Sequence, residues 1–310
     1  MHILLAGPTG QIGSALLAQL LAAGHQVTAA TRKVPSHTAC QYKHVTWIHY
    51  EKLFEDKFLP HSPIDWVISC VASRTGAPLD AKKVDFGLNI ELLTFAQKHK
   101  LKGFMLLSAI CVQKPKLAFQ REKLKFEKCL READLPFVIV RPTAFFQSLS
   151  TQVRRCYDGK VFYLFGNGHL TACKPISPSD LSAFMIGCLN DQTKHYQIHN
   201  IGGPGPAITP RDQVKLLESI LQRSIKTRSI SPKIFDVLRW FLWPFCAVSS
   251  RVSTAHEYLR IAKYYATESM LVWDSQTNTY NADLTAETGQ DTLDAHYRDL
   301  IAGFETERNA

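Results

Sequence analysis

A glycine-rich loop near the beginning of the chain constrains its fold more than any other feature. The run GPTGQIG, from Gly7 to Gly13, follows the apolar run HILLA and leads into the helix-period run QIGSALLAQLLAAG. Between a strand and a helix, this spacing is typical of dinucleotide-binding folds, although a glycine turn without a ligand is the alternative. Glycines here permit a tight turn, close approach of a pyrophosphate, and packing of the helix on the sheet. We therefore expect cofactor contacts from Gly7, Thr9, Gly10, Gln11, Ile12 and Gly13.

Short apolar runs alternate with helix-period runs through the first half of the 310 residues. Helices separate most of the expected strands, which lie at 2–7, 25–32, 45–50, 65–73, 103–110 and 136–146. Near-continuous apolar strands joined by helices predict a parallel sheet that is covered on both faces. We therefore predict an α/β fold of the Rossmann type, with a doubly wound parallel sheet and a smaller, mixed C-terminal part.

The alternating pattern loosens after about residue 150. Residues 159–168 predict a hairpin or a loop with a glycine turn, and Thr209 is a good N-cap for a helix that follows it. Residues of roughly 170–205 are expected to add elements to the sheet. Residues 151–310 are predicted to form the substrate-binding C-terminal region.

The end of the second expected strand carries basic residues where an acid is common. Chains that bind NAD usually have Asp or Glu there to bond the ribose hydroxyls, whereas this run reads AATRK and ends in Arg32 and Lys33. A guanidinium pairs with a 2′-phosphate, which an acid would repel. We therefore predict NADPH as the cofactor and residues 1–150 as an NADP-binding domain. The alternative is that Arg32 is a solvated loop residue.

Other segments are expected to complete the cofactor site by analogy with this fold. Small residues end the fourth strand, and Ser108 ends the fifth strand beside the expected nicotinamide. Lys123, on the next helix, is expected to bond the nicotinamide ribose. Ser108 and Lys123 are therefore the predicted catalytic residues. The remaining cofactor contacts are expected from Cys70, Val71, Ala72, Ser73, Pro142 and Thr143.

The helix after the fifth strand lacks an acid that short-chain dehydrogenases usually have. The usual spacing there is Tyr-x-x-x-Lys, and this chain has Phe119 four residues before Lys123. A carbonyl reductase needs an acid beside the oxygen because an alkoxide forms there. Two readings fit the missing acid. One is a reductase of this fold that acts on a conjugated alkene or a quinone, and the other is a non-catalytic NADP(H)-binding regulator.

Charge and cysteine content restrict the class of protein. The net charge of +9 indicates either an anionic partner or a solvated basic surface. Nucleic acid is not expected, because Lys and Arg are spread along the chain and no binding motif for it appears. The eight cysteines have no C-x-x-C spacing and form no cluster with histidines, so neither a metal site nor a disulfide scaffold is expected.

Location is predicted from the apolar runs. None is long enough to span a bilayer, and the nearest, at 234–248, is broken by Asp236, Arg239 and Pro244. We interpret it as a helix of the substrate-binding region or a surface-seeking segment. The protein is therefore expected to be cytoplasmic and able to associate peripherally with a membrane. The sequence leaves its oligomeric state open.

Long runs of the chain resemble the divinyl chlorophyllide a 8-vinyl-reductase family, NADPH-dependent type, within the atypical short-chain dehydrogenase/reductase (NmrA-like) superfamily. The most specific are SAICVQKP, which begins at Ser108, and CKPIS, which begins at Cys173. The resemblance covers most of 64–293 and is weaker from 33 to 63. Because no plant-type transit extension is present, we expect a bacterial member. Other similar runs are VISCVASRTG, VIVRPTAFFQSL, NIGGPGPAITPRDQ, YLRIAKYYATESMLVWD and GQDTL.

The resemblance implies an oxidoreductase of chlorophyll biosynthesis that reduces a vinyl group of a tetrapyrrole with hydride from NADPH. Hydride then adds to carbon, so no alkoxide forms and Phe119 is compatible with catalysis. A planar, anionic substrate is expected to contact Phe119. The aromatic pair Phe145 and Phe146 and the Trp- and Phe-rich segment 235–245 are expected to form an apolar slot for it. Cations at Arg74, Arg141 and Lys174 would neutralise its carboxylate. The alternatives are that the aromatic side chains belong to the core, and that Arg141 and Lys174 pair with backbone carbonyls or acids.

Overall fold

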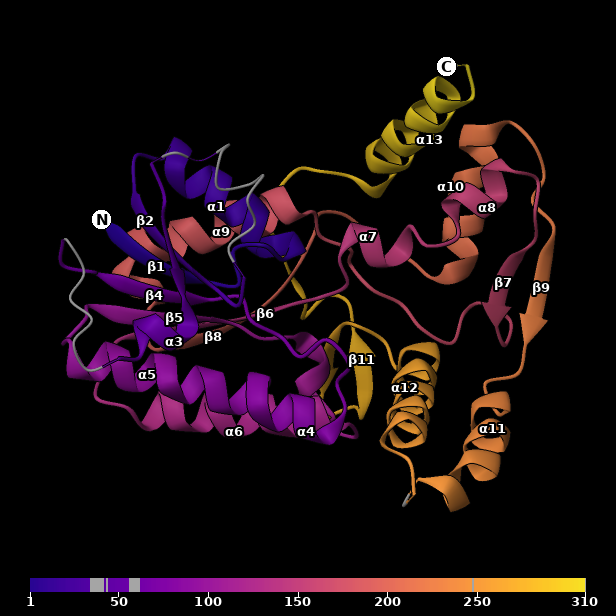
Figure 1. Ribbon diagram of the computed structural model, residues 1–310. Coiled ribbons are helices and arrows are strands. Elements are labelled where there is room, and N and C mark those ends of the chain that lie inside the picture. Colours follow the sequence, from indigo (N-terminus) through magenta and orange to yellow (C-terminus); the bar gives the residue numbers. More distant parts are fainter. Residues whose placement is uncertain (34–41, 43, 56–61, 247, 310) are drawn as a thin grey trace. The chain divides into compact units, whose positions relative to one another are not determined.

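The computed structural model describes residues 1–33, 42, 44–55, 62–246 and 248–309 (Figure 1). The chain divides into two compact units. The first consists of Met1–Arg141 and Leu181–His199, and the second of Pro142–Asp180 and Asn200–Ala310. The assignment of substrate binding to 151–310 stays a prediction.

A parallel sheet is the centre of the first unit, and its strands run in the order β8-β6-β5-β4-β1-β2-β3. The two-residue strand β12 pairs in parallel with Ile201 and Gly202, the last residues of β8, which belong to the second unit. The order reverses between β1 and β4, so the carboxyl ends of these two strands form the switch point where such sheets bind ligands. The strands are β1 (His2–Ala6), β2 (Gln26–Thr31), β3 (Thr46–His49), β4 (Trp66–Ser69), β5 (Gly103–Leu107), β6 (Phe137–Pro142), β8 (Gln197–Gly202) and β12 (Ala286–Glu287).

Helices cover both faces of this sheet, as the apolar strands predicted. Figure 1 shows α1 and α9 on one face and α5 and α6 on the other. The doubly wound Rossmann-type fold is therefore confirmed. The predicted helix after residue 83 begins with a π-helical turn, η1. The elements are α1 (Gln11–Ala22), α3 (Tyr50–Leu53), α4 (Pro78–Ala81), η1 (Lys82–Leu88), α5 (Asn89–Lys98), η2 (Ile110–Gln113), α6 (Ala118–Glu132), α9 (Pro178–Asn190) and η3 (Gln192–Lys194).

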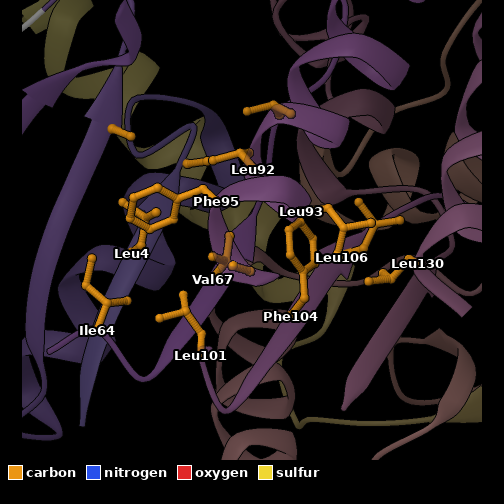
Figure 2. Close-up of a cluster of buried hydrophobic side chains, with 14 of the residues drawn as sticks. Leu4, Ile64, Val67, Leu92, Leu93, Phe95, Leu101, Phe104, Leu106 and Leu130 are labelled. Atoms are coloured by element: carbon orange, nitrogen blue, oxygen red, sulfur yellow. The ribbon is translucent and has the colours of Figure 1, made fainter. Parts of the chain in front are cut away.

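The core of the first unit lies between the sheet and the α5–α6 layer. Leu4, Val67 and Phe104 come from neighbouring strands and are fully buried. Figure 2 shows them with Leu92 and other side chains of α5. Every second residue of a strand points to the same face of the sheet, and the apolar residues of an amphipathic helix lie along one stripe. The two apolar surfaces therefore pack against each other here.

The second unit has a core of its own. Phe146 and Leu217 pack there with Tyr297, whose hydroxyl donates a hydrogen bond to the carbonyl of Leu149 at 2.8 Å. The elements are α7 (Phe146–Leu149), α8 (Val153–Tyr157), β7 (Phe162–Phe165), α10 (Pro210–Leu221), β9 (Thr227–Ile230), α11 (Ile234–Leu242), η4 (Trp243–Phe245), α12 (Ser250–Thr267), β10 (Val272–Asp274), β11 (Thr279–Asn281) and α13 (Leu293–Asn309).

The glycine turn predicted within 159–168 is present, but no hairpin forms there. Gly166 and Gly168 have φ values of 59° and 86°, which favour glycine. The strand before them, β7, pairs in parallel with β9 and not with a returning antiparallel strand. Of the two predicted alternatives, the loop with a glycine turn is therefore confirmed, because β7 pairs with a strand further along the chain.

The start of α10 is held by the predicted N-cap. The hydroxyl oxygen of Thr209 accepts a hydrogen bond from the amide of Asp212 at 3.3 Å. The Asp212 carboxylate accepts hydrogen bonds from the amide and the hydroxyl of Thr209 at 3.1 and 2.7 Å. The pKa of Asp212 is lowered, first by the Thr209 hydroxyl and then by the Thr209 amide. This reciprocal arrangement is a capping box.

We expect Thr209→Ala to lower the free energy of unfolding by about 1 kcal/mol, because an N-cap is lost. A lowered carboxyl pKa stabilises the fold above the unfolded value and loses this effect as pH falls. The difference between wild type and variant should therefore be largest above about pH 4 and shrink below it. Urea unfolding at several pH values measures it, with Thr227→Ala, at an exposed strand position, as the control. An equal difference at all pH values would contradict the proposed role of Asp212.

Candidate cofactor and active site

The glycine loop is shaped by close backbone contacts at the carboxyl end of β1. Gly7 has a φ of +81°, and a Cβ atom there would lie 2.9 Å from the carbonyl oxygen of Cys70. At Gly13 a Cβ atom would lie 2.0 Å from the carbonyl oxygen of Gly7. At Gly10 it would meet that same oxygen at an ordinary 3.5 Å. The protein itself therefore requires glycine at 7 and 13, whereas at Gly10 the small residue suits the predicted approach of a pyrophosphate.

The amino end of α1 offers uncompensated amide groups to a ligand. Gly10 is its N-cap, makes no side-chain capping bond, and is followed by no acidic residue in the first turn. Thr9, Gly10 and Gln11 are exposed, whereas Ile12 is buried. The first amides of a helix lack partners within the helix and lie at its positive end. This terminus therefore fits the phosphates of a dinucleotide.

Tyr50, at the start of α3, is a residue of this region that sequence reasoning missed. Its hydroxyl oxygen accepts a hydrogen bond from the amide of Gly7 at 3.1 Å, and this amide also donates to the carbonyl of Ala30 at 3.3 Å. Burial raises the pKa of Tyr50 to about 12, although the Gly7 amide and Arg32 oppose the shift. The phenol therefore keeps its proton. Arg32 and Lys33, at the end of β2, are exposed.

The end of β4 lies directly beside the glycine loop. The amide of Cys70 donates to the carbonyl of Ala6 at 2.9 Å, and desolvation raises the pKa of the Cys70 thiol to about 12, despite the nearby Lys123. This thiol therefore stays protonated. Val71 is buried, whereas Ala72 and Arg74 are exposed. Every cysteine that the structure describes is a free thiol, and the described residues include no group of side chains suited to a metal ion.

Lys123 is held by a buried ion pair with Asp85. The Nζ atom lies 3.1 Å from Oδ1 of Asp85, and the side chains are only 7% and 1% exposed. Asp85 stands in the π-helical turn η1, and its Oδ1 also accepts a bond from the amide of Ser73 at 3.4 Å. Among the described residues, Oδ2 of Asp85 has no hydrogen-bond partner. π-helical turns are frequent at functional sites, and an acceptor without a partner in the protein suits a ligand hydroxyl.

Ser108 donates its hydroxyl proton to a buried carboxylate. Its Oγ lies 2.5 Å from Oε1 of Glu127, which stands one turn after Lys123 on α6. Glu127 also accepts two hydrogen bonds from the guanidinium of Arg141: Nε donates to Oε1 at 3.1 Å and Nη2 to Oε2. A serine hydroxyl has one proton to donate. Ser108 therefore has none left for a substrate oxygen in this arrangement.

On the inward face of α6, Phe119 stands where a tyrosine is usual, and Glu127 adds an acid. Phe119 is half-buried one turn before Lys123, and residues one turn apart share a face. Glu127 was missed by sequence reasoning. A signal for it was present, because Lys123, Phe126, Glu127 and Leu130 have the spacing of one buried stripe, and all four are buried.

The predicted residues of the second unit are mostly engaged in contacts within that unit. Lys174 is buried, lies 2.6 Å from Oε1 of Glu287, and donates to the carbonyl of Thr285. Thr143 is buried, and its hydroxyl donates to the carbonyl of Lys174. These contacts favour the alternative in which Lys174 pairs with an acid and a backbone carbonyl, as Arg141 does with Glu127.

The aromatic pair of the second unit differs in burial. Phe146 is 3% exposed, and its ring lies 5.3 Å from that of His296, so it belongs to the core. Phe145 is half-buried, and Pro142 is buried. Only Phe145 of this pair therefore has surface left for a planar ligand.

Comparison with known proteins identifies relatives of this chain. A family model for NAD(P)H-binding domains matches residues 7–192. The chain is 37% identical to the chloroplastic divinyl chlorophyllide a 8-vinyl-reductase of Oryza sativa subsp. indica, over 96% of this chain and 78% of that protein. It is also 37% identical to the enzyme of the same name from Arabidopsis thaliana, over 97% of this chain and 77% of that protein.

Solved structures show the same fold at low identity. A UDP-glucose 4-epimerase from Thermotoga maritima superimposes with a TM-score of 0.72 and 16% identity, over 99% of both chains. A UDP-glucuronic acid 4-epimerase from Bacillus cereus, solved with NAD, gives a TM-score of 0.68 and 17% identity, over 98% of this chain and 100% of that one. The relatives decide what the fold alone leaves open: the chain belongs to the divinyl chlorophyllide a 8-vinyl-reductase family of NAD(P)H-binding proteins.

Proposed function

We propose that this protein is an NADPH-dependent oxidoreductase that reduces the conjugated vinyl group of a tetrapyrrole, converting divinyl chlorophyllide or protochlorophyllide to the monovinyl form. The proposal rests on one observation beyond the family. The position of the usual acid is Phe119, and the hydroxyl of Ser108 already donates to Glu127. A site in which neither the residue at the usual acid position nor Ser108 donates a proton to an oxyanion suits hydride addition to carbon better than carbonyl reduction.

The residues of the first unit fit the cofactor. When bound, NADPH supplies the hydride. The amide groups at the start of α1 would hold its pyrophosphate, and Lys123 would bond the nicotinamide ribose with protons that Asp85 leaves available. Residues Cys70 to Ser73 would lie beside the bound cofactor. Hydride adds to one vinyl carbon and a proton to the other, and together they convert vinyl to ethyl. The proton comes from a donor other than Ser108 or Phe119.

The preference for NADPH over NADH is proposed from Arg32, Lys33 and Tyr50. The two cations are exposed where the ribose phosphate would lie, and both favour a 2′-phosphate. The neutral phenol of Tyr50 keeps a proton to donate, while its oxygen accepts the amide of Gly7. We propose that this hydroxyl bonds the phosphorylated ribose.

The location and origin of the protein belong to the proposal as well. No helix in the described part of the chain is long and apolar enough to cross a membrane. The relatives compared above are named as chloroplastic, so a bacterial origin and a cytoplasmic location stay predictions. Peripheral association with a membrane is proposed from the exposed apolar side chains of α11 in the second unit.

Steady-state assays of the purified protein test the reaction. With NADPH and divinyl chlorophyllide, we expect NADPH oxidation and a monovinyl product that chromatography separates. Turnover with generic quinones but not with the tetrapyrrole would favour the reductase of another substrate. Binding of NADPH without turnover of any acceptor would favour the non-catalytic regulator, which the lost tyrosine also fits.

Ser108→Ala tests whether this serine acts as an acid. Because its proton is already donated to Glu127, we expect kcat for vinyl reduction to fall by less than about tenfold, whereas loss of a general acid costs about 100-fold or more. Phe119→Tyr, which restores the usual spacing, should not raise kcat. Lys123→Met serves as the comparison and should abolish NADPH binding. A loss of about 1,000-fold in Ser108→Ala, with NADPH binding intact, would contradict the assignment.

Arg32→Ala tests the choice of cofactor. Loss of a charge-assisted hydrogen bond worth about 1.5–3 kcal/mol should raise the Kd for NADPH by roughly 10- to 100-fold. The Kd for NADH should stay unchanged, as measured by fluorescence titration. Arg131→Ala removes an exposed cation at the far end of α6 and is the matched control. Equal losses for both cofactors would show that Arg32 does not contact the 2′-phosphate.

Tyr50→Phe tests the second contact to the ribose phosphate. It should raise the Kd for NADPH about fivefold through one neutral hydrogen bond. Thermal stability should change little, because the Gly7 amide keeps the carbonyl of Ala30 as its acceptor. A fall in stability with unchanged affinity would make the hydroxyl purely structural.

A further inference from the structure

A stripe of large apolar side chains is exposed on α11 and η4 of the second unit. Its members recur at the spacing of one helix face and continue into the following turn. Their exposed fractions run from 44% at Leu238 to 70% at Trp240. We define the exposed apolar ridge as Ile234, Val237, Leu238, Trp240, Phe241 and Trp243.

The ridge reverses the usual polarity of a surface helix. The side of α11 that faces its neighbours carries Phe235, whose ring lies 5.3 Å from that of Phe165. Asp236, one turn before Trp240, has a side chain that is 45% exposed and binds Lys263 of α12 at 2.6 Å. Figure 1 shows α11 beside α12, with the chain turning back between them. A surface helix normally points its charges to water and its apolar stripe inward. Exposed apolar patches of this kind mark interaction sites.

The charges around the ridge indicate the kind of partner. Between residues 226 and 251 the chain has the basic residues Lys226, Arg228, Lys233, Arg239 and Arg251, and the single acid Asp236. That acid is already bound to Lys263. Lys233 and Arg251 are exposed at the two ends of the apolar segment. This arrangement complements a negatively charged surface.

An anionic membrane matches both the aromatic and the basic residues. Tryptophan is favoured at the boundary of lipid and water because its ring is apolar and its N–H is polar. Each Lys or Arg near an anionic surface adds to the attraction. A second copy of this chain fits less well, since two such ridges in contact would bring their basic flanks together.

We propose that the exposed apolar ridge binds the interface of a membrane that contains anionic lipids. Helix α11 lies in the plane of the interface, its apolar side chains reach the acyl boundary, and Lys233 and Arg251 contact the headgroups. This mode of binding needs no membrane-spanning helix. The inference stands independently of the proposed reaction, because it concerns a surface and not the cofactor site.

Flotation of the full chain with vesicles tests the inference. The vesicles contain phosphatidylcholine alone, or equal parts of phosphatidylcholine and phosphatidylglycerol. We expect the wild type to float with the mixed vesicles, with a blue shift of tryptophan fluorescence. Trp240→Ser with Phe241→Ser should lower the partition coefficient by more than about tenfold, because two large apolar side chains no longer enter the interface.

Matched variants separate the ridge from general effects. Leu79→Ser with Leu284→Ser removes two other exposed apolar side chains and should leave vesicle binding unchanged. Lys233→Glu with Arg251→Glu should weaken binding to the mixed vesicles only. Unchanged NADPH affinity shows that each variant is folded.

Three results would overturn the inference. The first is a wild type that floats with neither vesicle, and the second is a ridge variant that floats as well as the wild type. The third is a dimer, seen by sedimentation, that the ridge variant loses while vesicle binding is unaffected, because the ridge would then join two copies of the chain.

Discussion

Two buried ion pairs on the inner face of α6 hold the side chains of the predicted site in place within the first unit. Lys123 and Glu127 lie on the inner face of this helix, among apolar side chains such as Phe126. Taking a charge out of water costs several kcal/mol, so both charges are tolerable only because Asp85 and Arg141 meet them. Loss of one partner would leave a buried charge uncompensated, at a cost of about 3–5 kcal/mol. The pairs therefore fix α6 against η1 on one side and β6 on the other.

The same pairs limit the chemistry that the site can perform. Asp85 keeps Lys123 in place without accepting all of its protons, so the ammonium can hold a ribose. Glu127, balanced by Arg141, accepts the proton of Ser108. With Phe119 in the position of the usual acid and the Ser108 proton already donated to Glu127, neither residue offers a proton to an alkoxide. The vinyl reductases among its relatives have a substrate for which no alkoxide is needed.

The predictable parts of the fold were those whose signal lies within one element. The apolar runs and the glycine spacing report local backbone requirements, and the contacts at Gly7 and Gly13 show why other residues would not fit. Partners distant in the sequence were not predictable. Neither the acid that meets Lys123 nor the parallel strand beside β7 follows from neighbouring residues. Tyr50 was missed for the same reason, since only the sheet brings β3 and α3 near the glycine loop.

The two helices that break the amphipathic pattern do so in opposite directions. Helix α6 turns charges inward, and each charge there has a partner in the protein. Helix α11 turns apolar side chains outward, where Trp240 and Phe241 are 70% and 59% exposed. A sequence tolerates such departures where a function compensates for them. In α6 the compensation lies within the unit and shapes the predicted cofactor site. In α11 it has to come from outside the chain, and the basic residues on either side point to an anionic surface as its source.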